Sequence, residues 1–177
     1  MVKGGALRPV SRKRECAMSR LDMFIDRMVS QRACIDHAAR LTASLPGPVF
    51  ELGLGNGRTY HHMVENMPDR EIYVFERAVA SHPQSTPPED MLILGDVHDT
   101  LVDALARFGR TASLIHADLG GHNPEKNDAF ARAISPLVEP LLAKGGLMVA
   151  SDRMYFDALV EQPLPAGAVS GRCFIYG

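Results

Sequence analysis

Three glycines spaced two residues apart follow a short apolar segment and a carboxylate, in the order Glu51, Gly53, Gly55 and Gly57. Positions without side chains at the end of a strand let the backbone approach a ligand closely. Glycine turns of this kind hold nucleotide-derived cofactors. The dinucleotide fingerprint G-x-G-x-x-G would need its third glycine at position 58, where this chain has Arg58. The spacing therefore favours a cofactor other than a dinucleotide.

Two more carboxylates, Glu76 and Asp96, each follow an apolar segment further along the chain. A carboxylate can accept two hydrogen bonds from a vicinal diol, and an acceptor is also what an exocyclic amine needs. Each residue also has a structural interpretation. Glu76 could be a solvated strand end, and Asp96 could cap a helix that starts at Val97. Together with Glu51, these residues place acids at three strand ends on one edge of a sheet, which favours a common ligand.

The elements that must position these residues alternate between short apolar strands and helices. We expect strands over residues 49–52, 71–76, 91–96, 112–118 and 147–151, and helices over 14–44, 59–66, 97–108 and from 123 to about 145, the last kinked at Pro136 and Pro140. This alternation predicts a doubly wound α/β domain with a mostly parallel sheet covered on both faces. Residues 158–161 and 171–176 are expected to form an antiparallel C-terminal hairpin. We expect residues 1–46 to be a helical extension that serves as a lid, and residues 47–177 to bind the cofactor, within one structural domain.

The pattern E-x-G-x-G-x-G, together with the order of the later acids, resembles class I S-adenosylmethionine (SAM)-dependent methyltransferases, in particular small bacterial members. The resemblance covers residues 48–177. It implies a glycine turn beneath the methionine part of SAM, Glu76 on the ribose hydroxyls, Asp96 near the adenine and Glu51 linked to the amino group. The full set of cofactor-binding residues that it implies is Glu51, Gly53, Gly55, Asn56, Gly57, Arg58, Thr59, Glu76, Asp96 and Val97.

The residues after the fourth and fifth expected strands bear on how the methyl acceptor is activated. Asp118 and Asp152 are similar to the ligands of metal-dependent small-molecule O-methyltransferases, which hold a divalent cation with oxygen atoms. Arg153 stands where that family has Asn or Asp, and a guanidinium would repel the cation, so no metal is expected. We therefore expect a general base. Its candidates are Asp118, His116 and His122, although His116 could instead be a core histidine and His122 an exposed loop residue.

The composition is that of an ordinary globular protein of 177 residues, with 46% hydrophobic residues and a net charge of −2. This charge gives no general attraction to nucleic acid or to an anionic membrane, although the first 20 residues are basic. Three unpaired cysteines favour neither a disulfide framework nor a zinc site, and they predict a cytoplasmic protein.

We therefore expect methyl transfer from SAM to the oxygen or nitrogen of a small molecule, in a chain that could form a homo-oligomer. Two other functions remain open at this point. The first is an NAD-dependent oxidoreductase, and the second is a non-catalytic SAM-binding partner subunit.

Overall fold

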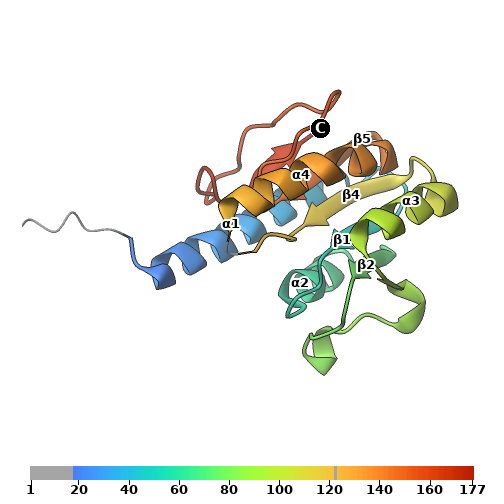
Figure 1. Cartoon of the computed structure of the whole chain (residues 1–177), viewed down its shortest axis with the longest axis horizontal. Helices are drawn as coiled ribbons and strands as arrows, with labels where there is room; N and C mark the ends of the chain where they lie inside the picture. The colour runs from blue at the N-terminus through green and yellow to red at the C-terminus, as the bar shows by residue number, and fades with distance from the viewer. Residues whose placement is uncertain (1–17, 122) are drawn as a thin grey trace, which may run out of the picture.

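A six-stranded sheet in the order β3-β2-β1-β4-β5-β6 forms the centre of the computed structural model, which describes residues 18–121 and 123–177 (Figure 1). The strands are β1 Val49–Leu52, β2 Ile72–Glu76, β3 Leu92–Leu94, β4 Ala112–Ala117, β5 Leu142–Ala150 and β6 Phe174–Tyr176. The α-helices are α1 Arg20–Leu41, α2 Arg58–Asn66, α3 Val97–Phe108 and α4 Pro124–Val138, and the short 3-10 helices are η1 Pro83–Ser85, η2 Glu89–Met91 and η3 Glu139–Leu141. Strands β1 to β5 pair in parallel, and β6 runs antiparallel to β5.

Helices cover both faces of the sheet, which confirms the doubly wound α/β prediction. On one face, Leu101 of α3 and Ile134 of α4 belong to the same buried cluster as Phe50 of β1. On the other face, Ile35 of α1 and Met63 of α2 pack in a second cluster. Because both faces are buried, β1 and β4 are apolar almost throughout and do not alternate with polar residues.

Helix α1 is anchored at its carboxyl-terminal half, and its first turns extend beyond the body of the domain (Figure 1). It begins with a capping box, in which Ser19 accepts from the Asp22 backbone N–H and the Asp22 carboxylate accepts from that of Ser19. Cys34 and Ile35 are buried, whereas Leu21 near the start is 66% exposed. Of the predicted extension 1–46, residues 1–17 lie outside the described part of the chain.

The predicted boundary between the last helix and the fifth strand was wrong. Helix α4 ends at Val138, η3 follows, and β5 begins at Leu142 rather than at residue 147. Pro140 has no N–H to continue the helical hydrogen bonding, so the chain leaves the α-helix before it. The pair Gly145–Gly146, expected to end the helix, lies inside β5, where the pairing with β4 shifts in register.

The predicted antiparallel pairing at the C-terminus is confirmed, with a smaller first arm than expected. Strand β6 pairs with β5, and Glu161 makes one isolated antiparallel bridge to Tyr176. Two backbone hydrogen bonds join Val160 and Gly177 on one side of that bridge, and the Gln162 N–H donates to the Ile175 carbonyl oxygen on the other. None of the helices in residues 18–121 and 123–177 has the length and apolar character needed to cross a membrane.

Candidate functional site

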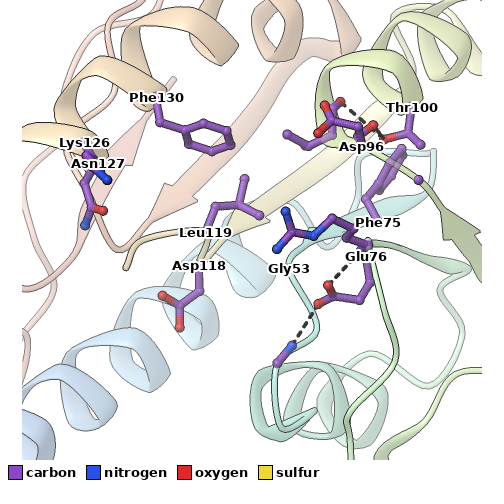
Figure 2. Close-up of a pocket in the computed structure, with 14 residues that line it drawn as sticks. Gly53, Phe75, Glu76, Asp96, Thr100, Asp118, Leu119, Lys126, Asn127 and Phe130 are labelled. Atoms are coloured by element: carbon purple, nitrogen blue, oxygen red, sulfur yellow. Dashed lines mark hydrogen bonds between the residues drawn. The ribbon is translucent and has the colours of Figure 1, made fainter. Parts of the chain in front are cut away.

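A cavity of about 440 Å³ lies at the carboxyl ends of β1, β2, β3 and β4 (Figure 2). It brings together six of the residues predicted from the sequence: Gly53, Gly55, Glu76, Asp96, Val97 and Asp118. In Figure 2, Glu76 and Asp96 lie on one side of this cavity, and Asp118 and Asn127 lie toward the other. Helix α4 adds Lys126, Asn127 and Phe130, which were not among the site residues predicted from the sequence.

Two glycines of the turn after β1 serve different purposes. Gly55 has φ +49°, and a Cβ added there would meet nothing within 4 Å, so this position keeps space open beside the cavity. Gly57 has φ +78° and starts α2, but a Cβ there would lie 2.4 Å from the Ser85 carbonyl oxygen. The left-handed backbone is available to glycine at little cost. Gly57 is therefore needed for packing against η1, and Gly55 for access to the cavity.

Glu76 ends β2 with its carboxylate fixed by backbone N–H groups (Figure 2). One oxygen accepts from Leu54 at 2.8 Å and Gly55 at 3.2 Å, and the other from Arg77 at 2.7 Å and Ala78 at 3.3 Å. Partial burial pushes the pKa of Glu76 up, but these donors outweigh it, so the pKa is lowered and the group stays ionised. Ligand hydroxyl groups could replace the two longer hydrogen bonds, which come from Gly55 and Ala78.

Asp96 acts as a helix cap and also lines the cavity. One carboxylate oxygen accepts from the His98 backbone N–H at 3.0 Å and lies 3.2 Å from the His98 Nδ1 atom. These bonds, the backbone one first, lower the pKa of Asp96. The structural interpretation of Asp96 as a cap is thus confirmed. Its second oxygen has no hydrogen bond within the described chain and is free for a ligand donor.

Asp118 follows β4 and is held by helix α1. Its Oδ2 atom accepts from Gln31 Nε2 at 3.0 Å and lies 3.4 Å from an Arg27 guanidinium nitrogen. Gln31 is buried, and the same Nε2 atom donates to Ser151 Oγ at 2.5 Å. Within the described chain, Oδ1 of Asp118 has no hydrogen-bond partner. The carboxylate is therefore oriented on one side and available on the other, at the wall of the cavity.

Gln31 and Arg27 were not among the residues predicted from the sequence, although the helical pattern contains a signal for Gln31. Gln31 lies three residues after Met28 and four before Ile35, on the helical face that carries apolar residues. A polar residue at such a position must find a hydrogen-bond partner when it is buried. Its partner, Asp118, is 87 residues away, so only the packed structure identifies it.

Glu51 and His116 form a fully buried pair behind the glycine turn and do not line the cavity. Oε2 of Glu51 lies 2.6 Å from His116 Nδ1, and Thr59 donates to Oε1 at 2.5 Å. Burial pushes the pKa of His116 down, but the Glu51 carboxylate outweighs it, so the pKa is raised. The structure therefore places His116 in the core, where Nε2 has no partner within the described chain.

Of the other predicted residues, Asn56 and Arg58 do not line the cavity. Asn56 is exposed, and the Arg58 guanidinium lies 6.0 Å from the centre of the Phe24 ring. His122 lies outside the described residues.

The two residues that a metal would use do not belong to a cluster of ligands. Asp152 accepts from Asn127 at 3.2 Å, and Arg153 turns to Glu161, with 3.3 Å between the charged groups. Within residues 18–121 and 123–177, no group of three or more His, Cys, Asp or Glu side chains could hold a metal ion.

Comparison with known proteins identifies the family. A family model described as S-adenosyl-L-methionine methyltransferase matches residues 18–177. The crystal structure of an S-adenosyl-L-methionine methyl transferase from Silicibacter pomeroyi is 73% identical, with a TM-score of 0.89 over 90% of this chain and 98% of that one. No curated protein sequence matches.

More distant structures share the fold. Human methyltransferase-like protein 13, solved with SAH, is 14% identical, with a TM-score of 0.54 over 86% of this chain and 80% of that one. MNMC2 from Aquifex aeolicus is 12% identical, with a TM-score of 0.52 over 87% of this chain and 60% of that one.

Proposed function

The chain belongs to the S-adenosyl-L-methionine methyltransferase family, and we propose that it methylates a small molecule at an oxygen or nitrogen atom. The family decides the donor and excludes the NAD-dependent alternative. Bound SAM supplies a methyl group on a positively charged sulfur, which is already activated for displacement. The contribution of the protein is therefore chiefly alignment, together with a place for the proton that the acceptor loses.

The cavity fits this donor. We propose that Glu76, already ionised and oriented by backbone donors, accepts from the ribose hydroxyl groups, and that the free oxygen of Asp96 accepts from the adenine side. Phe75, Val97 and Phe130 give the same cavity apolar walls suited to a flat ring. Gly55 leaves room beside the turn for the remainder of the donor.

The observation that carries the proposed chemistry is the one-sided anchoring of Asp118. Gln31 and Arg27 both contact Oδ2, which leaves Oδ1 at the cavity wall without a donor from residues 18–121 and 123–177. A lone pair on the acceptor oxygen or nitrogen forms the bond to the methyl carbon. The carbon–sulfur bond breaks with its electron pair on sulfur, which yields S-adenosylhomocysteine. The acceptor proton passes to Oδ1 of Asp118. We place the protein in the cytoplasm, where the buried thiols of Cys34 and Cys173 remain reduced.

The test measures S-adenosylhomocysteine formation with a panel of small hydroxy and amino compounds. Asp118→Asn should lower kcat by about 10²–10⁴-fold, the usual contribution of a general base, with little change in S-adenosylhomocysteine affinity. Gln31→Leu should lower kcat less, because it loosens the carboxylate without removing it. Asp103→Asn, at an exposed position on α3, is the control and should behave as the wild type.

Two results would contradict the proposal. Turnover of Asp118→Asn within threefold of the wild type would remove Asp118 from the reaction. Product formation with RNA or protein, and with none of the small compounds, would overturn the proposed acceptor class.

A further inference from the structure

A second cavity, of about 170 Å³, lies beside the donor cavity where α1 meets the end of β5 and the segment before β6. It is lined by Arg27, Asn127, Ser151, Asp152 and Arg172, together with three glycines. Asn127 lines both cavities, so the two are adjacent. A molecule in the smaller cavity would therefore lie next to the donor.

The charged groups of this smaller cavity are two guanidinium groups and one carboxylate. Arg172 has no ion pair or side-chain hydrogen bond within the described chain. The Nε atom of Arg27 is buried and has no hydrogen-bond partner within the described chain, and a terminal nitrogen of the same guanidinium lies 3.4 Å from Asp118. The single carboxylate, Asp152, already accepts from Asn127. Arg172 lines the cavity with no partner for its guanidinium in the described chain, so its N–H groups are available to a ligand there.

These donors match a carboxylate. A guanidinium presents its N–H groups as a planar fork, which fits the two oxygens of a carboxylate. The volume of about 170 Å³ compares with a share of about 30 Å³ for one liquid water molecule, which leaves room for a carboxylate and a few more atoms. Arg27 also touches Asp118, so a group held there lies close to the proposed base.

We infer that the smaller cavity binds the carboxylate of the methyl acceptor, which makes the acceptor a small acid with its hydroxyl or amino group directed at Asp118. Arg172 is the binding residue specific to this cavity, because Arg27 also orients Asp118. The identification of the bound acid as the methyl acceptor rests on the proposed function. The binding of a carboxylate in this cavity is independent of that function.

The experiment uses the full chain saturated with S-adenosylhomocysteine and follows protein NMR shifts on titration with butanoate or its neutral analogue, butanamide. Butanoate should bind with a dissociation constant of about 1–10 mM, in the range of weak specific ligands, and butanamide at least tenfold more weakly. Arg172→Gln should weaken butanoate binding at least tenfold, and Arg172→Lys less, since it keeps the charge and loses the fork. Arg110→Gln, at an exposed position away from both cavities, is the matched control and should bind as the wild type does.

Equal affinity for butanoate and butanamide would overturn the inference, as would undiminished butanoate binding by Arg172→Gln. Unchanged S-adenosylhomocysteine affinity in that variant verifies that it is folded. Turnover of acid and amide acceptor pairs distinguishes an acidic acceptor from small-molecule methylation in general. Amides methylated as fast as acids would contradict the acidic acceptor and leave small-molecule methylation intact, whereas butanoate binding without turnover of any small compound would contradict only the proposed function.

Discussion

Replacing Glu76 with alanine tests the donor site most directly, because this side chain supports both the glycine turn and the proposed ligand contacts. Of its four backbone donors, only the Leu54 N–H lies in a partly buried bond, and the other three are exposed and can turn to water. Losing one partly buried bond to a charged group costs about 1.5–3 kcal/mol in the free energy of unfolding. At about 2–4 °C per kcal/mol for a protein of this size, the Tm should fall by about 3–12 °C.

The effect of Glu76→Ala on binding should be larger than its effect on stability. Two hydroxyl bonds to a carboxylate, at about 1.5–3 kcal/mol each, amount to about 3–6 kcal/mol. S-adenosylhomocysteine should therefore bind about 10²–10⁴-fold more weakly. Glu76→Gln keeps one acceptor oxygen and should lie between the alanine variant and the wild type.

Isothermal titration calorimetry with S-adenosylhomocysteine, well below both melting temperatures, measures the affinity, and urea unfolding measures the stability. Glu89→Ala, at an exposed position in η2, serves as the control and should change neither quantity. A folded Glu76→Ala protein that binds S-adenosylhomocysteine within threefold of the wild type would refute the assignment of Glu76 to the donor.

Further predictions concern the buried Glu51–His116 pair and the glycine turn. His116→Gln should lower the unfolding free energy by about 3–5 kcal/mol, because it leaves the Glu51 carboxylate fully buried without its main partner; a loss under about 1 kcal/mol in urea unfolding would contradict this. The pKa of His116 is raised in the folded state, so its contribution to stability is full below about pH 6.5 and is lost as the pH rises through the folded pKa. This decline in stability with rising pH should be absent from His116→Gln. Gly55→Ala should lower the unfolding free energy by about 1–2 kcal/mol through its positive φ. Gly57→Ala should lower it more, because its Cβ would contact Ser85. Gly55→Ala should nevertheless weaken S-adenosylhomocysteine binding more than Gly57→Ala does. Calorimetry and urea unfolding of both glycine variants measure the two quantities, and the opposite ranking would show that our division of roles within the turn is wrong.

The alternation of strands and helices could be predicted from the amino-acid pattern alone, as could the glycine turn and the acids that end β2 and precede α3. These features depend on interactions between residues close in the chain, such as the apolar runs of buried strands and the capping of α3 by Asp96. In a parallel sheet, the carboxyl ends of the strands meet at one edge, so Glu76 and Asp96 were expected to face one ligand, and they line one cavity. The α4–β5 boundary was misread because Pro140, rather than the later glycine pair, ended the helical segment.

The surroundings of Asp118, the proposed base, became known only from the packed structure. Gln31 meets Asp118 across 87 residues, and Arg27 shares a cavity with Arg172 because α1 packs beside the end of β5 and the segment before β6. The packed structure also pairs Glu51 with His116 in the core, away from the cavity. Such contacts depend on how whole elements dock, and no local pattern of side chains encodes them. The donor could therefore be predicted from the chain, whereas the surroundings of the proposed acceptor site came from the packing of α1.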